Sequence, residues 1–244
     1  MSVIDKILKF KSPVKDYCTV VVVAAGSSQR MGKDKILMQL GDRPVVAHTL
    51  KAFQDSDVID EIIVVTRFES IQEIADICNA YGISKASKIV RGGKTRAESS
   101  LIGVCEASDE ATVIAIHDGA RPFPSSELIE RAVRAAYDNN AVTPAISATD
   151  TVRILNSKGA VASTPDRDTV ALIQTPQVFN ADIIKGALTK AIDKNTKLTD
   201  DCSAVEAIGV KVTVVAGELT NIKLTSAMDI YVAEKILADR GAQV

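Results

Sequence analysis

Short runs of apolar, largely β-branched residues recur along the chain, separated by stretches in which apolar side chains return every three or four positions. The short runs predict buried parallel strands, and the longer periodic stretches predict amphipathic helices. The predicted strands are Val20–Ala24, Ile62–Thr66, Ala86–Val90, Thr112–Ile116, Val142–Ile146 and Val212–Val215. The predicted helices are Pro44–Gln54, Ile71–Ala80, Thr95–Glu106, Ser126–Asn139, Ala181–Asp193, Thr199–Ile208 and Ser226–Arg240.

The alternation of strands and helices over so many units predicts an α/β fold with a Rossmann-like, mainly parallel sheet flanked by helices. No repeat, low-complexity tract or linker-like composition interrupts it, so residues 19–244 are predicted to form a single domain. Residues 1–18 are predicted to be an N-terminal helical extension, with Ile4, Ile7 and Leu8 on one face.

The segment Asp150–Phe179 departs from this alternation. Its apolar residues alternate only weakly, and Asn156–Gly159 have the composition of a hairpin turn. Two strands joined there would project from the sheet, as a β-arm at about residues 148–175. A plain surface hairpin and an arm that pairs with a second subunit are both compatible with this pattern.

The bulk composition narrows the class of protein. The chain has 244 residues, of which 46% are hydrophobic and 25% charged, as is usual for a globular protein with a sizeable core. Its formal net charge of −2 gives no chain-wide attraction to nucleic acid or to an anionic membrane. The four cysteines lack metal-like spacing, and neither a signal peptide nor a membrane span is apparent. We therefore expect a cytoplasmic protein with reduced cysteines that binds neither nucleic acid nor membrane.

Candidate chemistry follows the predicted strands, because ligands of open parallel sheets bind beyond the carboxyl ends of the strands. After the first strand come the small residues Ala25 to Ser28, then Arg30 and Lys35. This loop matches neither the dinucleotide fingerprint nor the P-loop. Exposed amides and nearby cations favour phosphate binding, and an ordinary turn with solvated basic residues is an equal alternative.

Two further loops carry similar signals. After the third strand, Gly92 and Gly93 precede a helix with Thr95 as its N-cap and Glu98 completing a capping box, which favours either an anion site or a plain capped loop. After the fourth strand comes Asp118. A buried carboxylate needs a partner, which Mg²⁺ bridging to phosphate or a nearby arginine would supply.

The remaining candidates are less specific. His117 is predicted to be structural, because only His48 accompanies it and no nucleophile triad is visible. Lys223 stands between apolar residues and is compatible with either an exposed edge or the cleft. Together, the strand ends supply glycine loops, one carboxylate and several cations, which indicates binding of nucleotide phosphates.

At these residues the chain resembles the 2-C-methyl-D-erythritol 4-phosphate cytidylyltransferase family, from about Thr19 to about Leu237. Six groups of motif residues occur in the family's order. They are Ala24-Ala25-Gly26 with Arg30-Met31-Gly32 and Lys35; Gly92-Gly93 with Arg96 and Ser99; His117 to Pro122; Asp166-Arg167 with Gln174 to Gln177; Thr199-Asp200; and Asn221, Lys223 and Thr225. Departures are Asp34 before the lysine, Lys94 after the second glycine, Gly119 within the third motif and Ser226 after the last threonine.

The resemblance implies transfer of CMP from CTP to 2-C-methyl-D-erythritol 4-phosphate, with release of pyrophosphate, in the non-mevalonate isoprenoid pathway. The implied catalytic residues are Arg30, Lys35 and Lys223. The implied nucleotide-binding residues are Ala24, Ala25, Gly26, Ser27, Gly92, Gly93, Ser99 and Asp118. The implied acceptor-binding residues are Arg121, Thr151, Arg167, Thr175 and Thr199. The resemblance further implies that Asp118 holds a Mg²⁺ cofactor, and that a homodimer with exchanged β-arms supplies Thr151 and Arg167 from the partner.

Two other functions are weighed against this one. A ribitol-5-phosphate cytidylyltransferase would share the nucleotide half, but the segments Thr164–Arg167 and Gln174–Gln177 favour the methylerythritol substrate. A nucleotide-binding protein without catalysis would be expected to lack members of the catalytic set, yet Arg30, Lys35 and Lys223 are all present.

Overall fold

The computed structural model describes residues 16–26 and 35–241. Most of the predicted N-terminal helix lies outside the described residues, and so do Ser27 and Arg30.

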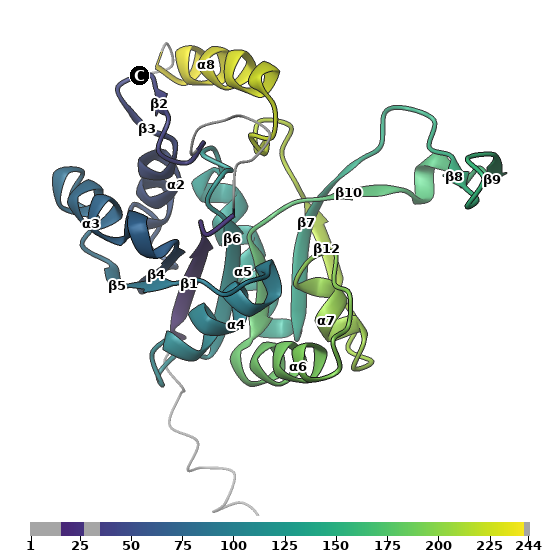
Figure 1. The fold of residues 1–244 in the computed structure, drawn as a ribbon, viewed down its shortest axis with the longest axis horizontal. Coiled ribbons are helices and arrows are strands. Elements are labelled where there is room, and N and C mark those ends of the chain that lie inside the picture. Colours follow the sequence, from purple (N-terminus) through teal and green to yellow (C-terminus); the bar gives the residue numbers. More distant parts are fainter. Residues whose placement is uncertain (1–15, 27–34, 242–244) are drawn as a thin grey trace, which may run out of the picture.

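An eight-stranded sheet forms the centre of the described structure, in the order β10-β7-β11-β6-β1-β4-β5, with β12 paired to β7 (Figure 1). Six of its strands confirm the predicted ones within a few residues at each end. They are β1 (Cys18–Val23), β4 (Glu61–Thr66), β5 (Ala86–Arg91), β6 (Val113–Asp118), β7 (Ala141–Ser147) and β12 (Thr213–Ala216). The added strands are β10 (Ala171–Ile173) and β11 (Gln177–Asn180). Because β10 and β11 are the antiparallel members, the predicted mainly parallel sheet is confirmed.

Helices cover both faces of this sheet. One layer holds α2 (Val45–Gln54), α3 (Ile71–Ala80) and α5 (Ser126–Asp138), and the other holds α4 (Arg96–Glu106), α6 (Ala181–Asp193) and α7 (Cys202–Glu206). The last helix, α8 (Ala227–Gly241), packs over a third apolar cluster. Short elements complete the fold: β2 (Gln39–Leu40), β3 (Arg43–Pro44), η2 (Phe68–Ser70) and η3 (Arg167–Thr169).

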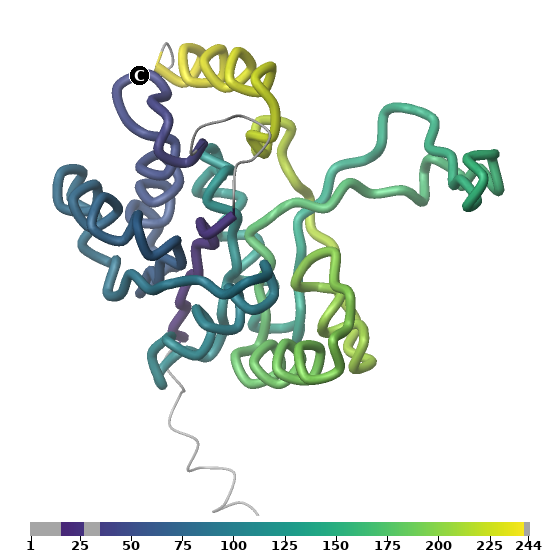
Figure 2. Tube along the Cα trace, viewed as in Figure 1, coloured from purple at the N-terminus to yellow at the C-terminus, as the bar shows by residue number. Residues whose placement is uncertain are grey.

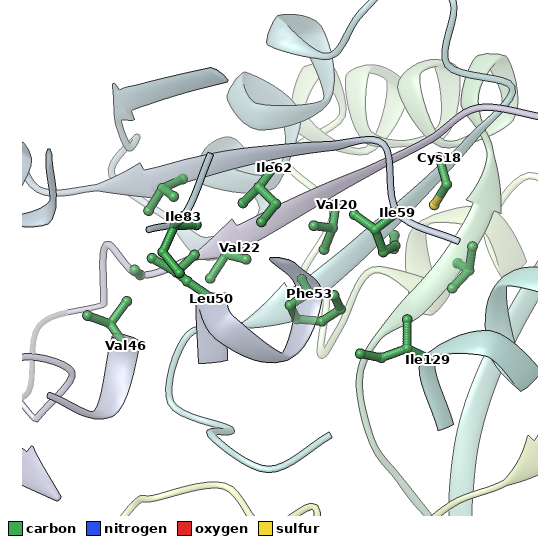
Figure 3. Close-up of a cluster of buried hydrophobic side chains, with 14 of the residues drawn as sticks. Cys18, Val20, Val22, Val46, Leu50, Phe53, Ile59, Ile62, Ile83 and Ile129 are labelled. Carbon is green, nitrogen blue, oxygen red and sulfur yellow. The ribbon is translucent and has the colours of Figure 1, made fainter. Parts of the chain in front are cut away.

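The alternating side chains of β1 explain why the sheet is covered on both faces. Cys18, Val20 and Val22 point into the cluster beneath α2, α3 and α5, which Figure 3 shows around Phe53. Val21 points to the opposite face, into the cluster beneath α4 and α6. Each such side chain contributes about 1.5–3 kcal/mol when fully buried. The strand is therefore held at the centre of the sheet, and its carboxyl end is fixed.

The predicted β-arm is confirmed. Figures 1 and 2 show the chain leaving the sheet after β7, running outward, and returning through β10. Near its far end, β8 (Ile154–Leu155) pairs with β9 (Val161–Ser163) across the predicted turn, where Gly159 has φ of 77°. Ile154, Leu155 and Val161 are exposed on this arm.

The helix predicted at Thr199–Ile208 is shorter in the structure, where α7 spans Cys202–Glu206. Its start is displaced because the Asp200 carboxylate accepts a hydrogen bond from the Ser203 N–H at 3.0 Å, as a capping side chain does. Its end is near Gly209, whose φ of 85° does not continue a helix.

Candidate active site

A pocket of about 400 Å³ lies at the carboxyl edge of the sheet. Strand pairing places it there, because Val23 at the end of β1 is in register with Asp118 at the end of β6 and with Val65 near the end of β4. Many predicted site residues line this one pocket: Ala24, Ala25, Gly26, Lys35, Gly93, Ser99, Asp118 and Lys223. The structure therefore brings together residues that are up to two hundred positions apart in the chain.

The two glycines before α4 bring the loops after β1 and β5 into contact. A Cβ atom added to Gly92 would lie 2.5 Å from the Ala25 Cβ and 2.9 Å from the Ser99 Oγ, so a larger residue does not fit there. The Gly93 N–H donates to the Ser99 Oγ at 3.1 Å, which in turn donates to the Thr95 carbonyl at 2.9 Å. These contacts fix the backbone before α4, which forms one wall of the pocket at the N-terminus of that helix.

The predicted helix cap is confirmed in part. The Thr95 hydroxyl accepts the Glu98 N–H at 3.1 Å, as expected of an N-cap. The Glu98 carboxylate accepts the N–H of Lys94 at 2.6 Å, one residue earlier than a capping box requires. As a result, a side chain of α4 fixes the backbone of Lys94, which lines the pocket.

Asp118 is the centre of charge in the pocket. Its Oδ1 accepts hydrogen bonds from Arg96, at 3.3 Å from Nε and 3.1 Å from Nη2. Its Oδ2 lies 2.8 Å from the Lys223 Nζ and 3.6 Å from the Arg121 Nε. The arginine partner expected for this carboxylate is therefore present, but two further cations share the same carboxylate.

The neighbouring charges shift the pKa values of Asp118 and Arg96. Burial raises the pKa of Asp118, but the charges of Arg96, Lys223 and Arg121 outweigh it and hold the pKa well below its usual range. Burial lowers the pKa of Arg96, and the two carboxylates beside it, Asp201 and Asp118, outweigh that effect and raise it. Asp118 is consequently an anion and Arg96 a cation at every physiological pH.

His117 has the structural role predicted for it. Its ring packs edge-on against Phe53 at 4.8 Å between centroids, and its Nε2–H donates to the Arg121 carbonyl at 3.1 Å. Burial lowers the pKa of His117 to about 4, so the ring is neutral at pH 7. Its Nδ1 therefore accepts the Thr175 hydroxyl proton at 3.0 Å, and the Thr175 Oγ1 accepts the Asp118 N–H at 3.2 Å.

Asn221 supports two predicted acceptor-binding residues, a role that its sequence pattern does not reveal. Its carbonyl accepts a hydrogen bond from the Arg121 Nη1 at 2.8 Å, and its side-chain amide donates to the Thr175 carbonyl at 2.8 Å. Arg121 and Thr175 are thus held beside Asp118 by one buried residue, through its backbone carbonyl and its side-chain amide. Because these residues are far apart in sequence, no local pattern reveals the connection.

Three predicted acceptor-binding residues lie away from the pocket of their own chain. Thr151 and Arg167 are exposed on the arm, where the Arg167 Nη1 donates to the Thr149 carbonyl at 3.3 Å. Thr199 is exposed as well and shares a hydrogen bond of 2.7 Å with the Ser203 hydroxyl. It lines a neighbouring pocket of about 450 Å³ on the other side of Arg96. Their roles remain predictions, as do those of the residues that line the pocket and those of Ser27 and Arg30, which lie outside the described residues.

A divalent cation is compatible with the pocket through a single carboxylate. Among the described residues, no three His, Cys, Asp or Glu side chains gather as a metal-binding group. Mg²⁺ is commonly held by one or two carboxylates together with substrate phosphates, and it does not require a cage of protein ligands. Asp118, anionic and at the pocket wall, fits that arrangement.

The sheet is mainly parallel, and the pocket at its carboxyl edge combines glycines, one carboxylate and several cations. Together with its solved structural neighbours, these features place the fold among the Rossmann-like nucleotidyltransferases. A family model described as 2-C-methyl-D-erythritol 4-phosphate cytidylyltransferase matches residues 18–239. The chain belongs to this family. The fold class and the family predicted from the motifs are thereby confirmed, and with them the assignment to the cytidylyltransferase enzymes of the non-mevalonate isoprenoid pathway.

Individual relatives agree with the family model. A 2-C-methyl-D-erythritol 4-phosphate cytidylyltransferase of Alkaliphilus oremlandii is 39% identical over 225 residues, which cover 91% of this chain and 95% of the relative. One from Clostridium botulinum is 38% identical, over 90% of this chain and 96% of the relative. A solved structure of 4-diphosphocytidyl-2C-methyl-D-erythritolsynthase from Anaerococcus prevotii has a TM-score of 0.82 at 35% identity and covers 91% of this chain and 96% of that one. Within the described part of the chain, no helix is both long and apolar enough to cross a membrane.

Proposed function

We propose that this chain transfers CMP from CTP to 2-C-methyl-D-erythritol 4-phosphate and releases pyrophosphate. The observation that carries the proposal is the Asp118 carboxylate, surrounded by Arg96, Arg121 and Lys223 in a glycine-lined pocket. Such a pocket places fixed positive charge around a triphosphate, and its single carboxylate suits one Mg²⁺ held jointly with phosphate oxygens. The expected cytoplasmic location is part of the proposal.

Nucleotidyl transfer requires little covalent chemistry from the protein. The acceptor's phosphate oxygen attacks the α-phosphorus of CTP in line, and the bond from that phosphorus to the bridging oxygen of pyrophosphate breaks. Because the attacking oxygen is already anionic, no general base is needed. Catalysis then depends on orientation and on stabilisation of the negative charge that grows on the α-phosphoryl oxygens and the leaving group.

The chain's own residues divide this work. Lys35 and Arg30 would hold the triphosphate and stabilise the transition state, because both belong to the segment that follows β1. Lys223 would leave Asp118 for the α-phosphate once CTP binds. When bound to Asp118, Mg²⁺ would supply additional charge neutralisation on the phosphates.

Base recognition would fall to the loop before α4. The Gly93 N–H and the Ser99 hydroxyl lie at the pocket wall, 3.1 Å apart, in positions set by the Thr95 cap. Ala25 and Gly92 leave little depth between the two loops, since a Cβ at Gly92 would meet the Ala25 side chain. A pocket of this depth favours a pyrimidine over a purine.

The acceptor would bind beside Asp118, against Arg121 and Thr175, and would be closed by the arm of a second subunit. Support for an exchanged arm comes from its projection away from the sheet (Figure 1) and from Thr151 and Arg167, which are exposed and do not line the pocket of their own chain. The exposed apolar side chains of the arm, such as Ile154 and Leu155, are also typical of a surface that is covered in an assembly.

A pyrophosphate-release assay with CTP and Mg²⁺ tests the proposal. Turnover is expected with 2-C-methyl-D-erythritol 4-phosphate and not with ribitol 5-phosphate. Turnover only with ribitol 5-phosphate would assign the chain to the sister activity. CTP binding without pyrophosphate release with either acceptor would support the non-catalytic alternative.

A further inference from the structure

Asp201 is a buried carboxylate that the proposed function does not use. It directly precedes α7, and only 1% of its surface is exposed. Its Oδ2 forms an ion pair with the Arg96 Nη1 at 2.7 Å, and Arg96 is the charged group that compensates this buried carboxylate. Burial raises the pKa of the Asp201 carboxyl, and the charge of Arg96 opposes that shift, so the ion pair with Arg96 is what favours the charged form of this residue.

Arg96 connects Asp201 to the active site. While its Nη1 faces Asp201, its Nε and Nη2 donate to the Asp118 Oδ1 on the opposite side. The guanidinium therefore bridges two carboxylates that come from different elements, the end of β6 and the loop before α7. A planar guanidinium can do this at fixed geometry, whereas a lysine ammonium cannot.

The far end of this bridge is anchored to the sheet. The backbone N–H groups of Asp201 and Cys202 both donate to the Gln177 Oε1, each at 3.1 Å. Gln177 is the first residue of β11, which is paired with β6, the strand that carries Asp118. Asp201, Arg96 and Asp118 are thus connected to two neighbouring strands in a closed ring of contacts.

The two oxygens of Asp118 consequently differ in how firmly they are held. Oδ1 is bound by Arg96, which is itself fixed by Asp201. Oδ2 faces Lys223, which carries its charge on a flexible stem, and the Arg121 Nε lies 3.6 Å from the same oxygen. Oδ2 is therefore the oxygen that can exchange its partner when a ligand arrives.

We propose that Asp201 is a positioning residue which, through Arg96, fixes the Asp118 carboxylate so that Oδ2 is presented to the divalent cation of the CTP complex. Asp201 also offsets the charge of Arg96, which would otherwise oppose a cation bound nearby. This role rests on the metal site of the proposed function. Asp201 itself touches neither substrate nor cation.

Mn²⁺ titration of the enzyme with CTP and no acceptor measures this role without turnover. Asp201→Asn keeps the shape of the side chain and removes its charge. We expect the dissociation constant of Mn²⁺ to rise about 10-fold or more, as for other residues that orient a metal ligand. The KM for CTP should rise with it, and the KM for the acceptor should stay close to the wild-type value. Asp138→Asn, at the exposed end of α5, is the matched control and should leave both unchanged.

A second variant keeps the test decisive if Asp201→Asn does not fold. Arg96→Lys preserves the positive charge but can reach only one of the two carboxylates, and it should weaken Mn²⁺ binding in the same way. In an Asp118→Asn background, adding Asp201→Asn should cause no further loss of CTP affinity, because Asp201 acts through Asp118.

Wild-type Mn²⁺ affinity in a folded Asp201→Asn variant would overturn the inference. If Asp201→Asn does not fold, wild-type Mn²⁺ affinity in Arg96→Lys would overturn it instead. So would a loss of CTP affinity that is as large in the Asp118→Asn background as in the wild type. Failure of the proposed function has a different signature. It would appear as absent pyrophosphate release from the wild-type enzyme, while Mn²⁺ and CTP binding would remain measurable.

Discussion

At the scale of single residues, the cations of the site are paired with one carboxylate of the protein, Asp118. Lys223 lies 2.8 Å from Asp118, so its ammonium is already beside the pocket before a triphosphate binds. Cations gathered at the site in advance stabilise the negative charge that grows in the transition state. Removal of a single cation should therefore affect the chemical step more than folding.

Lys35 provides the first test of this view. Lys35→Ala should lower kcat by about 100-fold or more, the usual effect of losing one donor to a transition state, and Arg30→Ala should do the same. Steady-state pyrophosphate release measures kcat, and circular dichroism checks the fold. Lys190→Ala on the exposed side of α6 is the control. Near-normal turnover in either site variant would remove that residue from the catalytic role.

His117 predicts a dependence of stability on pH. Its folded pKa of about 4 lies below the ordinary value of 6.5, so the unfolded chain takes up this proton first as the pH falls. The contribution of buried, neutral His117 to the free energy of unfolding should thus be fully present above pH 6.5. The free energy of unfolding should decrease by up to about 3 kcal/mol as the pH falls to 4. Urea unfolding between pH 7.5 and 4.5 measures this.

The effect of His117 on the pH dependence of stability can be separated from that of other titratable groups. In His117→Gln, the decrease between pH 6.5 and 4 should be smaller than in the wild type. His48, which is half-buried and also has a lowered pKa, adds a smaller effect of the same sign. A His117 imidazole that titrates near pH 6.5 by NMR in the folded protein would contradict the prediction.

Much of the pocket was predictable at this scale, and some of it was not. Ala24 and Gly93 stand in loops whose composition indicates a ligand, Ser99 stands in the first turn of the helix that follows, and all three do line one pocket. The bridge from Asp118 through Arg96 to Asp201 had no such signal, because it joins residues from three separate segments. Ion pairs of this kind depend on packing and not on spacing in the chain.

At the scale of elements, Gly103 lets α4 pack closely against the sheet. A Cβ at Gly103 would lie 2.8 Å from the Val65 Cγ2 and closer still to the Val21 Cγ1. Val21 and Val65 belong to β1 and β4, the strands whose ends carry the pocket. The absence of a side chain at Gly103 therefore sets the distance between α4 and the sheet.

Gly103→Ala should destabilise the protein by about 1–3 kcal/mol, because the added methyl group overpacks the interface by more than the gain in helix propensity returns. Gly186→Ala is the matched control. Gly186 lies in α6, and a Cβ there would meet nothing within 4 Å, so this change should stabilise by about 0.5–1 kcal/mol. Chemical denaturation measures both. A stabilising Gly103→Ala would refute the close packing.

The elements that the sequence pattern missed are short. In β11 only Val178 and Phe179 are apolar, too few to show a period, and Pro176 precedes them. The strand forms because its two faces fit apolar clusters on opposite sides of the sheet, Val178 in one and Phe179 in the other. For α7, side-chain capping by Asp200 displaced the start from the predicted residue.

At the scale of the whole molecule, the proposed exchange of arms predicts that residues of two chains form one site. Arg167 is exposed on the arm and belongs to the predicted acceptor site. If a partner supplies it, Arg167→Ala should raise the KM for the acceptor far more than the KM for CTP. Equal effects on both constants would contradict that role.

Mixing two inactive variants tests the exchange itself. Arg167→Ala impairs the arm and Lys223→Ala impairs the pocket, so each homodimer should be nearly inactive at low acceptor concentration. When the two are unfolded and refolded together, a heterodimer with exchanged arms contains one intact site. About a quarter of wild-type activity should then return, because half of the dimers in a random mixture are heterodimers with one site of two restored. No recovery would show that each arm serves its own chain.

Local periodicity and motifs of a few adjacent residues were enough to predict the α/β alternation, the capped glycine loop before α4 and the family. The place of β11 in the sheet, the contact of Lys223 with Asp118 and the bridge from Asp118 through Arg96 to Asp201 became visible only in three dimensions. A local pattern specifies which face of an element is apolar. Which elements then become neighbours, and which charges they bring into contact, follows from packing all of those faces at once.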